Sequence, residues 1–210
     1  MAPPRKPLYL TVDLEEWFHL LDCEAAGGPQ AWPSQPSRIT GNTHGLLDLF
    51  DRHQAKATFF VLGWVAEHHP ALVREVQDRG HRIGCHSHHH TLVWSQSPEG
   101  FRSETRRAIQ TIEEVTGTAI RQYRAPGFSI TRETLRAFDV LMELGIEVDA
   151  SLFPGRHAHG GLGRAFPDTP FWLCTPSGQV LEFPMSLTRW GPLEFATAGG
   201  GYFRALPWAL

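Results

Sequence analysis

The segment KATFFVLGWVAEHHPALVREVQDRGHRIGCHS, residues 56–87, decides the fold. Its apolar runs at 56–62 and 81–87 predict two strands, and HPALVREVQDRG between them predicts a helix. Pro70 stands at the start of that helix and Gly80 just past its end, which is the usual asymmetry of helix termini. A strand, a helix and a second strand in this order predict a parallel βαβ unit.

The same alternation continues on both sides of this unit. Further strands are predicted at 8–13, 120–126, 146–151, 171–175 and 179–185, the last two joined as a hairpin around Ser177-Gly178. Further helices are predicted at 41–53 with Asn42 or Thr43 as N-cap, at 97–117 with Ser97 as cap and Gly117 as terminator, and at 131–145. We therefore expect one α/β domain over residues 1–210.

The composition is that of an ordinary globular protein, with 41% hydrophobic and 20% charged residues in 210. A net charge of −3 offers no basic surplus for nucleic acid or anionic lipid, so a nucleic-acid partner is not expected. The N-terminus has no apolar run of signal length, and no window of eighteen apolar residues occurs. A cytoplasmic protein without a transmembrane segment is predicted; its oligomeric state stays open.

Four reactive side chains fall at or just beyond the carboxyl ends of four predicted strands: Asp13, His86, Arg124 and Asp149. A barrel gathers such ends around one mouth, whereas an open sheet spreads them along an edge. We therefore predict a distorted, incomplete (β/α) barrel of about six or seven parallel strands.

The stretch HSHHH, residues 86–90, contains four histidines in five positions and suggests a metal site. His86 and His90 have i,i+4 spacing, so one helical turn would aim both at one point; His86 with His89 is the competing pair. A catalytic zinc usually takes three protein ligands, so a carboxylate is expected from elsewhere in the chain.

Asp13 and Glu15 in TVDLEEW supply two candidate carboxylates at the end of an apolar strand. One acid would bind the metal, and the other would be free to deprotonate a water whose pKa zinc lowers to about 7. The alternative is that these acids merely open a solvated loop.

Four short motifs follow one another along the chain: Thr11-Val12-Asp13-Leu14-Glu15, His86-Ser87-His88-His89-His90, Arg124-Ala125-Pro126 and Asp149-Ala150-Ser151-Leu152-Phe153-Pro154. Together and in this order they resemble the polysaccharide deacetylase family, which is carbohydrate esterase family 4 with the NodB homology domain. The resemblance implies Asp13 as base and Glu15, His86 and His90 as metal ligands. It implies that Arg124 orients the base, that Pro126, Gly127 and Ser151 contact the substrate, and that Asp149 is the partner of a general acid.

The implied activity is metal-dependent removal of N-acetyl groups from sugar residues of a polysaccharide or its precursor, so the implied partner is an N-acetylated glycan. The metal would be Zn²⁺, although two histidines and a carboxylate also suit Co²⁺, Ni²⁺, Mn²⁺ or Fe²⁺. The stretches RAPGFSIT, DASLFPGRH and GGGYFRALP resemble the branch associated with exosortase and exopolysaccharide loci.

The chain departs from the family at the fifth motif, a histidine that acts as general acid downstream of GGGYFRALP. The sequence stops at Leu210 before that position, so we expect a C-terminal truncation. His157 and His159 are the only later histidines that could substitute as the acid. Two rival functions remain: hydrolysis of a small amide or ureide, and catalytically silent glycan binding.

Overall fold

The computed structural model describes residues 8–23, 26–155, 157–163, 166–190 and 193–196. Its strands form a seven-stranded sheet in the order β1-β2-β3-β4-β5-β7-β6 and a separate two-stranded sheet, β8-β9. The strands are β1 (Leu10–Leu14), β2 (Ala57–Val61), β3 (Arg82–Cys85), β4 (Gln122–Tyr123), β5 (Val148–Asp149), β6 (Phe171–Thr175), β7 (Gly178–Glu182), β8 (Leu187–Trp190) and β9 (Leu193–Ala196).

The main sheet is curled but not closed. Its first six strands in that order pair in parallel, and only β6 runs antiparallel, joined to β7 by the hairpin predicted around Ser177-Gly178. The ring of Tyr9, just before β1, lies 5.0 Å from the ring of Phe183, just after β7, so the two sides of the sheet approach each other. The prediction of an incomplete (β/α) barrel is confirmed.

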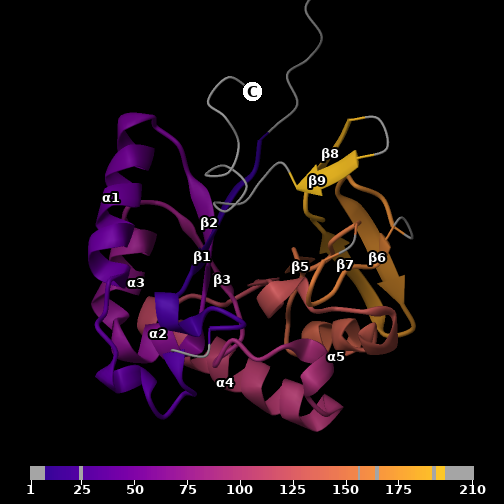
Figure 1. Cartoon of the computed structure of the whole chain (residues 1–210), viewed down its shortest axis with the longest axis horizontal. Helices are drawn as coiled ribbons and strands as arrows, with labels where there is room; N and C mark the ends of the chain where they lie inside the picture. The colour runs from indigo at the N-terminus through magenta and orange to yellow at the C-terminus, as the bar shows by residue number, and fades with distance from the viewer. Residues whose placement is uncertain (1–7, 24–25, 156, 164–165, 191–192, 197–210) are drawn as a thin grey trace, which may run out of the picture.

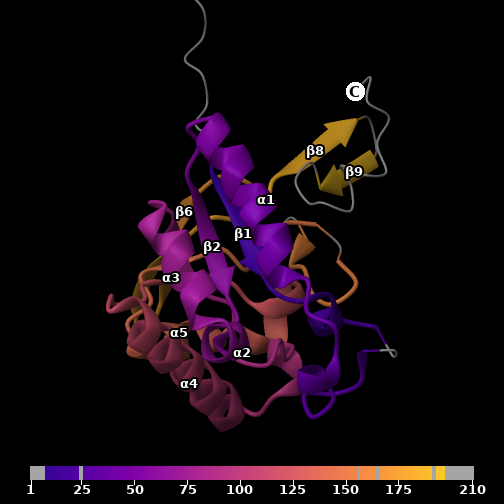
Figure 2. The same cartoon turned by 90° about the vertical axis from the view of Figure 1, so that its left-hand side faces the viewer.

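Helices surround this sheet on its outer side. In Figures 1 and 2, α1 and α3 lie over β1 and β2, and the hairpin β8–β9 stands apart from the main sheet. Helix α4 packs against α2, α3 and α5. The α-helices are α1 (Ile39–Arg52), α2 (Gly63–His68), α3 (Pro70–Asp78), α4 (Pro98–Thr116) and α5 (Ala137–Glu143).

Helix α4 follows its sequence signals closely. The Ser97 hydroxyl oxygen accepts a hydrogen bond from the Gly100 N–H, Pro98 occupies the first turn, and Gly117 ends the helix at φ 65°. Its apolar face buries Phe101 and Ile112 in the core. Local chemistry alone therefore sets both ends of this helix.

Helix α1 begins at Ile39, so the predicted caps Asn42 and Thr43 were wrong and lie inside the helix. The cap comes instead from the Glu16 carboxylate, which accepts hydrogen bonds from the backbone N–H groups of Arg38 at 3.0 Å and Ile39 at 3.2 Å. A carboxylate at a helix N-terminus satisfies unpaired N–H groups and complements the helix dipole. This partner is 22 residues away in sequence, out of reach of a local prediction.

Several other predicted helix and strand boundaries differ from those in the structure. The helix predicted at 131–145 is a 3₁₀ turn, η6 (Arg132–Thr134), followed by the shorter α5, and the strands predicted at 120–126 and 146–151 shrink to two paired residues each. Helix α2 and the hairpin β8–β9 were not predicted.

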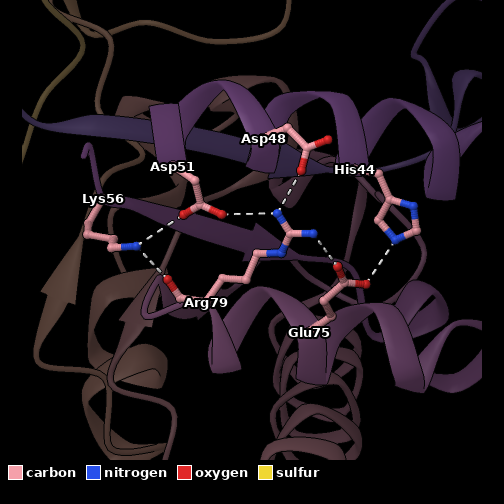
Figure 3. A network of polar contacts seen from close by, with 6 residues as sticks. All are labelled: His44, Asp48, Asp51, Lys56, Glu75 and Arg79. Atoms are coloured by element: carbon pink, nitrogen blue, oxygen red, sulfur yellow. Dashed lines mark hydrogen bonds and ion pairs between the residues drawn. The ribbon is translucent and has the colours of Figure 1, made fainter. Parts of the chain in front are cut away.

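Helices α1 and α3 are also joined by an ionic network (Figure 3). Arg79 on the carboxyl side of α3 donates to Asp48 at 2.8 Å and Asp51 at 3.1 Å on α1, and to Glu75 at 2.9 Å. His44 Nε2 lies 2.8 Å from Glu75. Exposed ion pairs of this kind each contribute little to the stability of the fold, so we regard this network as a link between the two packed helices.

Within the described residues, no helix combines the length and the apolar character needed to cross a bilayer.

Candidate metal centre

Glu15, His86 and His90 come together at the carboxyl ends of β1 and β3. One ligand atom from each residue lies within 4.8 Å of the others. Parallel pairing of β1, β2 and β3 puts their carboxyl ends on the same side, which brings together residues some seventy positions apart in sequence. The described residues contain no other group of three potential ligands this close.

The two histidines converge through an irregular loop, so the helical turn predicted between them was wrong. Ser87 and His90 have positive φ values of 68° and 58°, a conformation that costs a non-glycine residue about 1–2 kcal/mol. The Ser87 hydroxyl oxygen accepts the His90 N–H at 3.1 Å, and the rings of His86 and His90 lie 5.1 Å apart. Strain of this kind is typical of functional loops.

Both imidazoles are suited to bind a cation. The Nδ1 of His86 lies 2.8 Å from the backbone carbonyl of Arg124; since a carbonyl can only accept, Nδ1 carries the hydrogen and Nε2 keeps its lone pair. Burial lowers the pKa of His86, and burial together with His86 lowers the pKa of His90 to about 3. Near neutral pH both rings are therefore uncharged, and each can offer the lone pair of a ring nitrogen to a cation.

Glu15 completes the set and provides a test of whether a cation fits. Burial, with the neighbouring Asp13 carboxylate, raises the pKa of Glu15 to about 8. Its Oε2 is buried, lies 3.1 Å from His90 Nε2 and receives no hydrogen bond from any described residue. A buried carboxyl oxygen that has no hydrogen-bond partner and faces two neutral imidazoles fits a divalent metal.

Asp13 lies beside these three residues and is held by an arginine. Arg124 Nη1 donates to Asp13 Oδ1 at 2.8 Å, and Arg124 Nη2 donates to Thr11 Oγ1 at 3.0 Å. Burial acts to raise the pKa of Asp13, but the Arg124 guanidinium and the nearby imidazoles outweigh it and hold that pKa below its usual value. The side chain keeps 29% of its surface exposed, so an ionised oxygen can meet a substrate or water.

Arg124 is itself fixed from several sides. Its Nε donates to the backbone carbonyl of Ala150 at 3.2 Å, and its guanidinium lies 4.3 Å from the centre of the Phe60 ring. Pro126, which is buried, and Gly127 follow in the 3₁₀ turn η5 (Pro126–Phe128).

Gly127 occupies a left-handed backbone conformation in which a side chain would be strained. Its φ is 58°, and an added Cβ would lie 2.7 Å from Leu21 Cδ1. The turn is thereby set tightly against the loop that follows β1.

Asp149 and Ser151 form an internal bridge. The Ser151 hydroxyl donates to Asp149 Oδ2 at 2.8 Å and accepts the Ala125 N–H at 2.8 Å. Both residues are fully buried, so Ser151 connects two loops of the site. Ser151 was predicted to contact the substrate, but its hydroxyl is directed at these internal partners.

Glu182 at the end of β7 was not predicted as part of the site. It is fully buried and is the register partner of Asp149 on the neighbouring strand. The signal was present in QVLEFPM, where an acid inside an apolar strand needs a partner.

The other candidate histidines lie outside the cluster of Glu15, His86 and His90. The competing candidate His89 has its Nδ1 3.7 Å from Glu104, and His88 is buried with its Nε2 3.4 Å from Glu67. His159 Nε2 lies 2.9 Å from Asp22. The His157 ring packs on Phe128 and Phe153, and GGGYFRALP lies outside the described residues.

Comparisons with known proteins agree with this geometry. The chain is 30% identical over 106 residues to the peptidoglycan-N-acetylglucosamine deacetylase PgdA of Listeria monocytogenes, covering 50% of this chain and 22% of PgdA. A candidate polysaccharide deacetylase of Mycobacterium smegmatis superposes with a TM-score of 0.68 at 24% identity, over 92% of this chain and 64% of that chain.

A family 4 carbohydrate esterase from Streptomyces lividans, solved in complex with acetate, superposes with a TM-score of 0.51 at 26% identity, over 68% of this chain and 60% of that chain. Residues 150–210 match a family described as a domain of unknown function, DUF3473. Residues 2–148, well over half of the sequence, match the family model described as polysaccharide deacetylase, and the chain therefore belongs to the polysaccharide deacetylase family.

Proposed function

We propose that this protein is a metal-dependent hydrolase that removes N-acetyl groups from sugar residues of a glycan. The observation that carries the proposal is that Asp13, which is hydrogen-bonded to Arg124 and is not part of the cluster, lies beside Glu15, His86 and His90. Membership of the polysaccharide deacetylase family and likeness to a named peptidoglycan deacetylase support it. The chain spans only about a fifth of that relative, so the activity stands as a proposal.

Glu15, His86 and His90 would hold the metal, which we propose to be Zn²⁺. The set of two imidazoles and one carboxylate is that of several catalytic zinc sites, with Co²⁺, Ni²⁺, Mn²⁺ and Fe²⁺ as chemical alternatives. A divalent ion held there supplies Lewis acidity toward an acetamide carbonyl and an attacking water.

Asp13 takes the proton from the attacking water. It is suited to this role because the Arg124 guanidinium keeps it ionised, and the hydrogen bonds that Arg124 donates to Asp13 and to Thr11 fix the arrangement. A base held in place before the reaction begins avoids the entropy loss of finding the water.

The backbone N–H of Gly127 is proposed to stabilise the oxyanion that forms on the acetamide. Its left-handed conformation and close packing on Leu21 fix the direction of the peptide group. Loss of one such donor typically raises the barrier by about 2.7–4 kcal/mol.

The glycan would be contacted by Trp94, which follows the histidine loop in η4 (Val93–Ser95). Its side chain is 49% exposed, and its indole N–H donates to the His159 carbonyl at 2.7 Å, which fixes the ring. His159 in turn contacts Asp22 of the loop after β1. An exposed, immobilised aromatic face suits a pyranose ring. That the glycan is an exopolysaccharide is inferred from the resemblance of the sequence to the branch of the family associated with exosortase and exopolysaccharide loci.

The test measures acetate release from N-acetylglucosamine oligomers and from an N-acetylated bacterial glycan. Chelation should abolish release and Zn²⁺ should restore it, while small cyclic amides should not be opened. Glycan binding that is indifferent to chelators, with no acetate released, would instead support the silent binding protein. Ring opening of ureides without acetate release would support the small-amide hydrolase.

A further inference from the structure

Two buried acids stand side by side on neighbouring strands behind the metal centre. Asp149 on β5 and Glu182 on β7 are Cα partners in a parallel pair, so their side chains project from the same face of the sheet. Both are fully buried. Glu182 belongs to the segment that matches only a domain of unknown function.

Each acid holds part of the same turn, residues 149–152. Asp149 accepts hydrogen bonds from the Ser151 N–H at 2.9 Å and the Ser151 hydroxyl at 2.8 Å. Glu182 Oε1 accepts the Leu152 N–H at 3.0 Å. The turn is therefore fastened to both strands at once.

We expect the two carboxyls to hold one proton between them. Burial raises the pKa of Asp149, and burial together with the Asp149 carboxylate raises the pKa of Glu182 well above its usual value. Two adjacent buried carboxyls cannot both ionise without a large penalty, so one of them should stay protonated; Glu182 Oε2, which is buried and has no hydrogen-bond partner among the described residues, is free to carry that shared proton.

The turn formed by residues 149–152 holds Arg124 in place. The Ala150 carbonyl accepts from Arg124 Nε at 3.2 Å, and the Ser151 hydroxyl accepts the Ala125 N–H at 2.8 Å. Arg124 in turn binds Asp13. A continuous chain of contacts thus runs from β7 to the proposed base.

We propose that Glu182 is a positioning residue for the deacetylase site: by standing beside Asp149 on the neighbouring strand and accepting the Leu152 N–H, it holds the turn that orients Arg124 toward Asp13. This inference rests on the proposed function. It gives the segment of unknown function a part in positioning the site, since its strand β7 pairs with β5 behind the site.

Two substitutions separate positioning from simple packing. Glu182→Gln keeps an acceptor for the Leu152 N–H and supplies an amide N–H for Asp149, whereas Glu182→Met fills a similar volume with neither. Gln179→Met, at an exposed position on the same strand, is the matched control.

We expect Glu182→Met to lower kcat by about ten- to a hundredfold, since small displacements of catalytic groups have effects of that size. KM and zinc affinity, measured by titration calorimetry, should stay close to wild type. Glu182→Gln should restore most of the lost kcat, and Gln179→Met should change nothing. Rates are compared at a temperature where circular dichroism shows all variants folded.

An unchanged kcat in Glu182→Met, or an equal loss in Glu182→Gln, would overturn the proposal. If Glu182→Met does not fold, Glu182→Asp, which shortens the acid by one methylene group, takes its place with the same expectation. Carboxyl ¹³C NMR of the wild-type protein gives a readout independent of activity. Glu182 should remain protonated at neutral pH, and ordinary titration of both acids would refute the shared proton even if the deacetylase function itself fails.

Discussion

Replacing Glu15 by glutamine should stabilise the metal-free protein, against the usual effect of core substitutions. The structure raises the pKa of this carboxyl from 4.5 to about 8, so its ionisation is less favourable in the folded state by roughly 5 kcal/mol at 1.36 kcal/mol per pH unit. The folded state binds the proton more tightly than the unfolded chain. The stability that this proton contributes is therefore complete below pH 4.5 and is lost as the pH rises to about 8.

At pH 7 this loss amounts to about 3 kcal/mol, and glutamine avoids it because it carries no charge. For a chain of 210 residues, that corresponds to a rise in Tm of roughly 6–12 °C in Glu15→Gln without metal. Zinc should reverse the order. The wild type gains about 4.1 kcal/mol at a thousand times its Kd, more than the deficit of about 3 kcal/mol, while the variant, having lost the anionic ligand, gains little.

The assay is thermal unfolding followed by circular dichroism from about pH 5 to 9, with a chelator and then with Zn²⁺. Glu16→Gln is the matched control, since the neighbouring carboxylate caps α1 and has no part in the ligand set. Glutamine keeps only one of the two capping oxygens, so this variant should lose at most about 0.5–2 kcal/mol with or without zinc, and the zinc increment should stay intact. If Glu15→Gln is less stable than the wild type in chelator at pH 8, or gains as much from zinc, the assignment of Glu15 is wrong.

Three further predictions address the base, the metal and the glycan. Zinc binding at pH 6 should release about one proton, because Glu15 must lose its proton while the imidazoles are already neutral and a zinc-bound water, with a pKa of about 7, is still mostly protonated; calorimetry in buffers of different ionisation enthalpy measures this, and release close to zero at that pH would contradict it. Arg124→Lys should lower kcat about a hundredfold with zinc affinity nearly unchanged, since one ammonium cannot replace the three contacts of the guanidinium; steady-state kinetics beside zinc titration checks this, and a near-normal kcat counts against the role of Asp13 as base. Trp94→Ala should raise KM for a tetrasaccharide several-fold more than for a monosaccharide, whereas Trp172→Ala, which removes an equally exposed indole on the edge strand β6, should not; equal effects of the two substitutions would remove Trp94 from the binding surface.

Much of the fold follows from local signals. The βαβ pattern predicted the parallel strands, and Ser97, Pro98 and Gly117 predicted the ends of α4, because caps and terminators act over three or four residues. The helix at Ile39 could not be placed in this way, since the carboxylate that caps it comes from Glu16 across the fold.

By itself the sequence determined which residue types are present and in what order: acids at 13 and 15, histidines at 86 and 90, an arginine at 124. Periodicity placed them at strand ends, and parallel strands bring such ends to one side. Only the tertiary structure decided how they meet. Positive φ values at Ser87 and His90, rather than a helical turn, direct the two rings toward Glu15.

The tertiary structure likewise decided which acids act together. Glu182 becomes the partner of Asp149 only because β7 inserts between β5 and β6, a strand order that no local pattern encodes. Burial and proximity then set the charge of each acid. Protonation depends on solvent exclusion and on neighbouring charges, and both arise from contacts between residues far apart in the chain.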